Sequence, residues 1–208
     1  PRNAGAYLRL GYVNLKVENT VEAEAYFTRR RQQYPLDENI ALTYYYWGEY
    51  YYGRNEMQKA ADEFQYILSN FSENKYARDA ALGLARSYTA LGYYQEAFDI
   101  IDYVERRWPR LYLESPPVLE LMGDVAYRQG NLDFALDKYM VYYNLMPNGP
   151  NADVILTRIG DVHARKRQLA AAKTAYMRAE ELFPDKDGGL VAMMRLAEVG
   201  INDTPEIQ

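Results

Sequence analysis

The apolar residues of this chain recur in stretches of helical length, which short polar turns separate. In the stretch that follows residue 40, Tyr44, Trp47, Gly48 and Tyr51 occupy the i, i+3, i+4 and i+7 positions of one helix face. Comparable stretches come in pairs along the whole sequence. The pattern therefore predicts an all-α chain built from paired amphipathic helices.

The helix pairs repeat at a nearly constant interval, because each pair ends in a large apolar residue followed by a residue that stops a helix. These endings are Tyr34-Pro35, Phe71-Ser72, Trp108-Pro109, Met146-Pro147 and Phe183-Pro184. Their second members lie 37 or 38 residues apart, and a fixed period in this range indicates one helical unit stacked on copies of itself. One extra residue in the linker 110–115 explains the longer interval.

The endings define the domain organisation, which we predict to be one continuous array over residues 1–208. Five repeats are expected at approximately 4–40, 41–77, 78–115, 116–152 and 153–189. Residues 190–201 would form a capping helix or the first helix of a truncated sixth repeat, and 202–208 a tail. The sequence starts at Pro1 inside the first expected helix, so we expect a fragment of a longer protein.

Small residues recur at fixed positions of the repeat. One set lies in the first helix of each pair and comprises Gly11, Gly48, Ala85, Gly123 and Gly160. A second set lies in the second helix and comprises Ala23, Ala60, Ala97, Ala135 and Ala172. Glycine inside a helix costs about 1 kcal/mol relative to alanine, so its recurrence needs a packing reason. We predict that the two sets face each other, and that the large residue four positions after each alanine fills space towards the neighbouring helix.

This register resembles the tetratricopeptide repeat (TPR) family. The second repeat supplies its sequence marks with Tyr44, Trp47-Gly48, Tyr51, Ala60 and Phe64, and the fourth with Leu119, Met122-Gly123, Ala135, Tyr139 and Pro147. Departures are Ser72 in place of proline, Ala85 in place of glycine, and Arg30 where a small residue is usual. The resemblance implies a right-handed superhelical solenoid of antiparallel helix pairs, with five TPR-like repeats plus a C-terminal helix.

The period exceeds the roughly 34 residues usual in the family. Longer repeats are similar to those of bacterial envelope proteins, such as the accessory protein of the tol-pal system and the outer-membrane barrel-assembly lipoproteins. That similarity implies a periplasmic or cell-envelope location, while a cytoplasmic one stays open.

In the family that the chain resembles, the first helices line a concave groove that binds a protein or peptide segment. Residues on the inward rows of these helices are the expected partner-binding residues: Tyr12, Tyr45, Glu49, Tyr52, Arg86, Asp124, Tyr127, Arg128, Asp161 and Arg165. The groove would be aromatic in its N-terminal half and of mixed charge in its C-terminal half. For the four tyrosines, a packing role and a binding role both stay open.

The composition of the chain argues against nucleic-acid binding, disulfide formation and membrane insertion. A formal net charge of −5 disfavours the RNA-binding pentatricopeptide arrays, since nucleic-acid binding needs a basic face. The chain has no cysteine, which excludes disulfides and thiol nucleophiles. No stretch approaches 18 uninterrupted apolar residues, so no membrane insertion is expected.

Candidate chemistry is sparse. His163 is the only histidine and falls at a packing position. Asp124 and Asp161 are one repeat apart, too far to share one metal ion. We therefore predict no catalytic residues, metal or cofactor, and a non-catalytic scaffold for protein–protein interaction. The alternative is a self-assembling scaffold, a homo-oligomer formed through its repeat ends, because the expected C-terminal helix presents Leu190, Met193, Met194 and Ala197 without a second helix to cover them.

Overall fold

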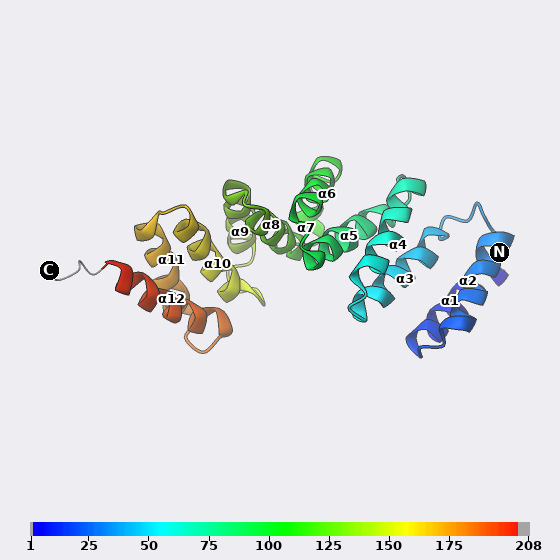
Figure 1. The fold of residues 1–208 in the computed structure, drawn as a ribbon, viewed down its shortest axis with the longest axis horizontal. Coiled ribbons are helices and arrows are strands. Elements are labelled where there is room, and N and C mark those ends of the chain that lie inside the picture. Colours follow the sequence, from blue (N-terminus) through cyan, green and yellow to red (C-terminus); the bar gives the residue numbers. More distant parts are fainter. Residues whose placement is uncertain (1, 204–208) are drawn as a thin grey trace. The chain divides into compact units, whose positions relative to one another are not determined.

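The computed structural model describes residues 2–203, and every regular element in this range is an α-helix (Figure 1). The helices are α1 (Arg2–Lys16), α2 (Thr20–Gln33), α3 (Ala41–Gly53), α4 (Met57–Asn70), α5 (Ala77–Leu91), α6 (Tyr94–Arg107), α7 (Leu111–Glu114), α8 (Pro117–Gln129), α9 (Leu132–Leu145), α10 (Ala152–Arg165), α11 (Leu169–Leu182) and α12 (Asp187–Asp203). The prediction of an all-α chain of paired helices is confirmed. The exact boundaries of the repeats stay predictions.

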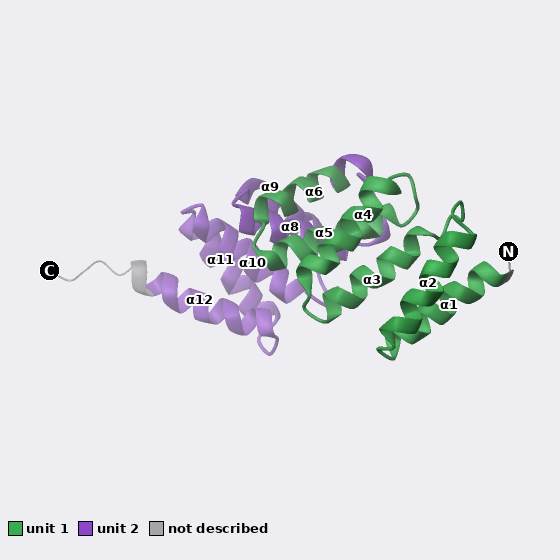
Figure 2. Cartoon of the chain, turned by 45° about the vertical axis from the view of Figure 1, so that its right-hand side comes forward, with its two compact units in different colours: residues 1–104 green, residues 105–208 purple. Residues whose placement is uncertain are grey.

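The chain divides into two compact units, Pro1–Val104 and Glu105–Gln208, here called unit 1 and unit 2 (Figure 2). In unit 1, α2 packs against α1, and α4 packs against both α3 and α5. In unit 2, α9 packs against α8 and α10, and α12 covers α10 and α11. The linker with the extra residue contains the short helix α7, which is anchored by the buried side chain of Leu111. None of the helices within residues 2–203 is long and apolar enough to cross a membrane.

The recurrent glycines of the first helices make room for rings from the second helices. A Cβ atom added to Gly48 would lie 2.5 Å from the Phe64 ring, and one added to Gly123 would lie 2.4 Å from the Tyr139 ring. The prediction that the glycines face the alanines is therefore wrong. The residue closest to each glycine is the ring that follows the alanine by four positions. The alanines are buried beside it, and the prediction that the large residues fill the space between helices is confirmed.

The turn inside each helix pair uses one left-handed residue at a fixed position of the repeat. The residues with positive φ are Glu18, Asn55, Gly92, Gly130 and Arg167. Glycine and asparagine adopt this conformation readily, whereas glutamate and arginine do so rarely. The repeat geometry thus imposes the same turn even where the residue type does not favour it.

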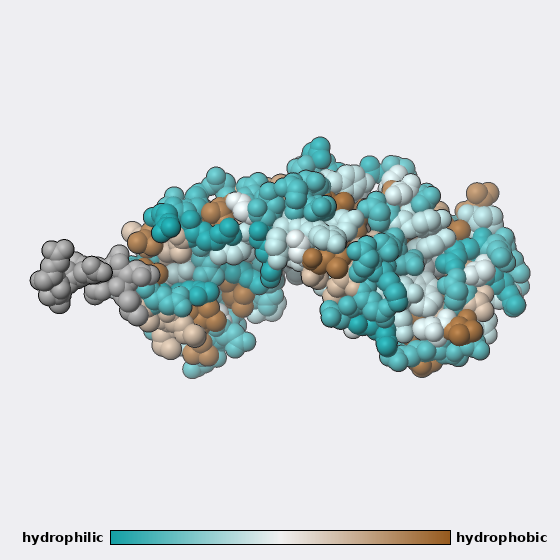
Figure 3. Space-filling model, viewed as in Figure 1, coloured by the Kyte–Doolittle hydropathy of each residue, from teal (hydrophilic) through white to brown (hydrophobic). Residues whose placement is uncertain are grey.

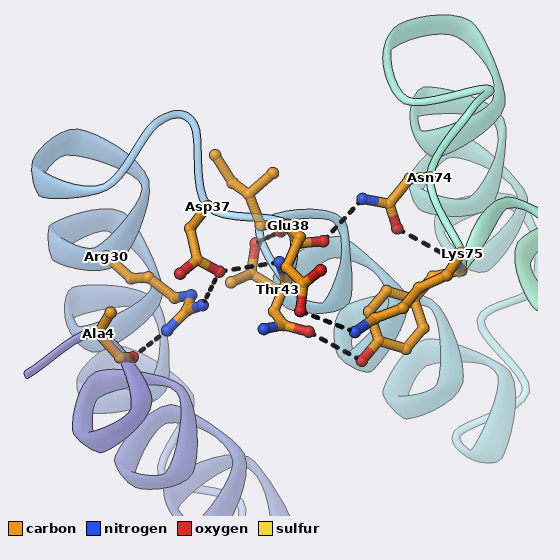
Figure 4. A network of polar contacts seen from close by, with 10 residues as sticks. Ala4, Arg30, Asp37, Glu38, Thr43, Asn74 and Lys75 are labelled. Carbon is orange, nitrogen blue, oxygen red and sulfur yellow. Dashed lines mark hydrogen bonds and ion pairs between the residues drawn. The ribbon is translucent and has the colours of Figure 1, made fainter. Parts of the chain in front are cut away.

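Arg30, which replaces the usual small residue, is a buried link between α1 and the linker after α2. Its guanidinium donates to the carbonyl oxygen of Ala4 and pairs with the carboxylate of Asp37 (Figure 4). The same linker is tied to the next one, because Asn74 donates to the carbonyl oxygen of Glu38 at 2.7 Å and Lys75 pairs with its carboxylate at 3.2 Å (Figure 4). Polar contacts between successive linkers therefore supplement the apolar core of unit 1.

Candidate partner-binding site

Three of the predicted binding residues form a cluster on α3 and α5 of unit 1. The guanidinium of Arg86 lies 2.9 Å from the Glu49 carboxylate and 5.2 Å from the centre of the Tyr52 ring. Both charged side chains are more than a third exposed, so the pair is a surface feature. The cluster presents a tyrosine face that is covered on one side by a cation.

Tyr45 lies deeper than these three residues. Its ring centre is 5.7 Å from that of Phe64, and burial, followed by the nearby carboxylates of Glu49 and Asp79, raises the pKa of its hydroxyl to about 12. Tyr45 therefore serves mainly the interhelix core, with its hydroxyl close to the surface cluster.

A small cavity of about 150 Å³ lies between α1 and α3. Tyr12 and Glu49 line it together with Lys16 and Tyr46. The ring centres of Tyr12 and Tyr46 are 4.5 Å apart, and the Lys16 ammonium lies 5.4 Å from the Tyr12 ring centre. Two residues that the sequence predicts for the same surface thus share one hollow of unit 1.

Unit 2 holds a larger cavity, of about 280 Å³, on its first helices. Four predicted residues contribute to its lining, which comprises Asp124, Tyr127, Arg128, Tyr139, Arg158 and Asp161. The structure therefore gathers most of the C-terminal half of the predicted set around one concave feature.

The two aspartates of this cavity are held by matching sets of partners. The Tyr139 hydroxyl donates to Asp124 at 2.6 Å, and Arg158 pairs with Asp124 at 2.8 Å. One repeat later, the Tyr176 hydroxyl donates to Asp161 at 2.8 Å and Arg195 pairs with it at 3.2 Å. We call these sets the Asp–Tyr–Arg triads. Because both carboxylates are engaged, they shape the cavity wall more than they offer free negative charge.

Burial governs the electrostatics of the first triad. It raises the pKa of the Asp124 carboxyl, although the Arg158 guanidinium and the Tyr139 hydroxyl each act to lower it. Burial and the neighbouring Asp124 carboxylate also raise the pKa of the Tyr139 hydroxyl, which therefore stays protonated and donates. The triad is a fixed polar contact at neutral pH.

Two arginines bring positive charge to the unit 2 cavity: Arg128 lines it, and Arg165 contacts Tyr127 of its lining. Arg165 donates to the carbonyl oxygen of Tyr127 at 2.5 Å and lies 4.6 Å from the centre of its ring. Arg128 is exposed and forms no hydrogen bond or ion pair with the side chains that the structure describes. Arg128 is consequently available to an anionic group.

Sequence reasoning missed the arginines of the triads and assigned their tyrosines to packing alone. A signal was present: Asp124 and Asp161, Tyr139 and Tyr176, and Arg158 and Arg195 are three pairs, each 37 residues apart. The earlier repeats have Phe27, Phe64 and Ile101 at the tyrosine position, so the hydroxyl appears only where an aspartate and, one repeat later, an arginine are also present. That joint appearance could have identified the contact.

His163 lies near the end of α10, where its Nδ1 is 2.7 Å from the side-chain oxygen of Gln168. The histidine therefore has a local contact within its own turn. Within residues 2–203, no three histidine, aspartate or glutamate side chains gather in a way that would hold a metal ion.

Comparison with known proteins gives a family match over a single repeat and a consistent fold over most of the chain. The tetratricopeptide repeat model matches residues 154–186, while no curated protein matches the chain by sequence. The fold is similar to that of YrrB, described as a TPR protein with an unusual peptide-binding site, with a TM-score of 0.71 and 20% identity over 90% of each chain. It is also similar to MamA from Desulfovibrio magneticus RS-1 (TM-score 0.69, 16% identity, 90% of this chain and 98% of that one). A tetratricopeptide repeat protein from Parabacteroides merdae is comparable (TM-score 0.69, 14% identity, 97% of this chain and 78% of that one). The family match over residues 154–186 and these likenesses show that the chain has the fold of tetratricopeptide repeat proteins.

Proposed function

We propose that this chain is a non-catalytic scaffold that binds an extended segment of a partner protein on its first helices. The observation that carries the proposal is the unit 2 cavity, where Asp124, Tyr127, Arg128 and Asp161 line one hollow. The peptide-binding site of YrrB, whose fold is similar, supports the same reading.

The chemistry of the cavity favours an acidic residue next to an apolar one in the partner segment. Tyr127 offers a large apolar face, and tyrosine is enriched at protein interfaces for this reason. Arg128 offers an unpaired guanidinium, which recognises a carboxylate through two parallel hydrogen bonds. The volume of about 280 Å³ is at the lower end of ligand pockets, so it suits one or two side chains.

A peptide-display selection against the whole chain tests the proposal. We expect selected peptides to carry an acidic residue, and their affinity by calorimetry to fall at least tenfold in Tyr127→Ala and in Arg128→Gln. Tyr52→Ala combined with Tyr127→Ala tests the unit 1 surface as well. Tyr93→Ala, which removes a tyrosine 46% exposed on the turn between α5 and α6, is the matched control. Peptides that bind the cavity variants as tightly as the parent would contradict the proposal.

Self-assembly is the second candidate function, and it rests on α12. Ala192 and Val199 are buried, whereas Leu190, Val191, Met193 and Met194 remain 40–62% exposed. Apolar surface is visible in the region of α12 in Figure 3. Association through this face predicts a mass above that of the monomer in light scattering, and Met193→Glu with Met194→Glu should restore the monomer. A parent chain that stays monomeric at millimolar concentration would remove this candidate.

A further inference from the structure

A third cavity lies between α2, α3 and α4 of unit 1. Its volume is about 640 Å³, and its lining includes Glu24 and Arg31 of α2, Tyr44, Trp47 and Tyr50 of α3, and Glu63 of α4. The hollow beside Tyr12 instead lies between α1 and α3. The large cavity is thus separate from the predicted binding residues, none of which lines it.

The charges in this cavity leave one carboxylate uncompensated. Arg31 pairs with Glu24, and Arg54 pairs with Glu18 at 3.0 Å and with Glu56 at 3.4 Å. Glu63 is half-buried and has neither an ion pair nor a hydrogen bond with the described side chains. Burial raises the pKa of its carboxyl to about 7, more than the nearby Arg31 lowers it. A half-buried carboxylate without a partner is costly, and an entering cation would relieve that cost.

Aromatic rings form the rest of the wall. The Trp47 indole nitrogen donates to Glu24 at 2.8 Å, which fixes the ring, and Tyr50 lies edge-on to it at 5.5 Å. Rings of this wall already attract cations: Arg31 lies 4.8 Å from the Tyr44 ring centre, and Arg54 lies 5.6 Å from that of Tyr50. Fixed aromatic faces beside a carboxylate suit a ligand that joins an apolar stem to a positive head.

We propose that this cavity binds a lysine side chain of a partner polypeptide, with its methylene stem along Trp47 and Tyr50 and its ammonium group at Glu63. A polypeptide is favoured over a free amine because Val21, which is 77% exposed, lies at the cavity wall. Val21 offers apolar contact to residues that flank the lysine. The cavity has ample volume for such flanking groups.

Calorimetry of the whole chain with the blocked tetrapeptide acetyl-Leu-Lys-Leu-Lys-amide at pH 8 tests the inference. We expect binding that weakens at least tenfold in Glu63→Gln and stays unchanged in Asp62→Asn. The control removes the same charge from the neighbouring, exposed position of α4. It therefore changes the net charge as Glu63→Gln does, but it does not change the cavity lining. Circular dichroism would confirm that both variants keep their helicity.

Two further ligands complete the experiment. The norleucine analogue of the tetrapeptide should bind at least tenfold more weakly, since it lacks the ammonium group. 1,4-Diaminobutane should bind more weakly than the peptide, since it makes no contact at Val21. Equal binding of the norleucine peptide, equal effects of the two α4 variants, or binding of the diamine alone would each overturn the inference.

Acidity provides an independent readout. The titratable groups facing Glu63 are Glu24 and Arg31 from α2, Tyr44 and Tyr51 from α3, and its neighbour Asp62 on α4. Lowering the pH from 8 to 5.5 protonates Glu63 and should weaken binding of the lysine peptide several-fold. The same change in pH should have little effect on the residual affinity of Glu63→Gln, and an equal pH dependence in both proteins would contradict the assignment.

Discussion

Phe64 of unit 1 and Tyr139 of unit 2 occupy the same position in their repeats, and each ring lies over a glycine of the preceding helix. Phe64 also lies against a second glycine, because a Cβ atom on Gly83 would be 2.6 Å from its ring tip. Tyr139 instead meets Asp124, and Arg158 stands at the position equivalent to Gly83. The comparison shows that the backbone of the repeat fixes where the ring lies, while side chains of the same and of the following repeat make the surroundings of its tip apolar or polar.

The largest expected effect tests what the two units share. Gly48→Ala and Gly123→Ala should each lower the free energy of unfolding by about 2 kcal/mol, because the new methyl group overlaps a buried ring. The better helix propensity of alanine offsets part of that cost. Chemical denaturation measures both values.

Gly53→Ala is the matched control, since a Cβ atom at Gly53 of α3 meets nothing within 4 Å. It should be neutral or up to about 1 kcal/mol more stable than the parent. A Gly48→Ala protein as stable as Gly53→Ala would show that the ring does not need the glycine.

The next effect separates the units. Arg158→Met removes a cation that pairs with the triad carboxylate of Asp124, which is 28% exposed, and with Glu120 at 2.8 Å, and we expect a loss of about 1.5 kcal/mol in urea denaturation. Arg86→Met breaks the more exposed pair with Glu49 and should change stability by less than about 0.5 kcal/mol. Equal losses of stability in the two variants would mean that Arg158 contributes no more to the stability of the fold than Arg86 does.

A smaller effect isolates the hydroxyl group. Tyr139→Phe gives unit 2 the residue type of Phe64 and removes the hydrogen bond to Asp124, for an expected loss of about 1 kcal/mol. Tyr93→Phe, at an exposed position, should have no measurable effect on the urea midpoint. An unchanged midpoint in Tyr139→Phe would show that the triad adds nothing to stability.

The smallest effect concerns the carboxylates of the two cavities. The aspartates of the unit 2 cavity each pair with an arginine, whereas Glu63 has no ion pair with the described side chains. Burial raises the folded-state pKa of Glu63 from 4.5 to about 7, so the folded chain binds this proton more tightly than the unfolded chain. The stability from this group is present below about pH 4.5 and is lost as the pH rises through about 7. Because Glu63 faces an open cavity, solvent screening limits the change to about 0.5–1 kcal/mol.

Glu63→Gln should therefore melt at a higher temperature than the parent at pH 8 and show little difference at pH 4.5. Thermal unfolding followed by circular dichroism at the two pH values gives both comparisons. A parent chain that gains stability relative to Glu63→Gln on going to pH 8 would reverse the sign and contradict the burial of this carboxyl.

Much of the fold could be predicted from the sequence, because periodicity and helix-stopping residues are local signals. A positive φ is typical of glycine, as at Gly92 and Gly130, whereas the residue types of Glu18 and Arg167 give no hint of it. The partner of each glycine was misjudged because a helix face shows which residues point inward but not which neighbour they meet.

The candidate site could be predicted only one helix at a time. Helical spacing placed Asp124, Tyr127 and Arg128 on one face, and the structure gathers them around a cavity. The partnership of Asp124 with Arg158 depends on the offset between successive repeats, which periodicity does not reveal. The cavity around Glu63 forms where three helices meet, and the pattern within any one helix does not predict how the three pack.

The triads also mean that copies of the fifth repeat could follow one another directly. Residues 153–189 contain Arg158, which serves the aspartate of the preceding repeat, and Asp161, which needs an arginine from whatever follows. In tandem copies of this segment, the arginine of each copy would pair with the aspartate of the copy before it. It is accordingly a natural building block for longer synthetic arrays, whereas copies of the fourth repeat, with Leu121 at the arginine position, would leave each aspartate without its cation.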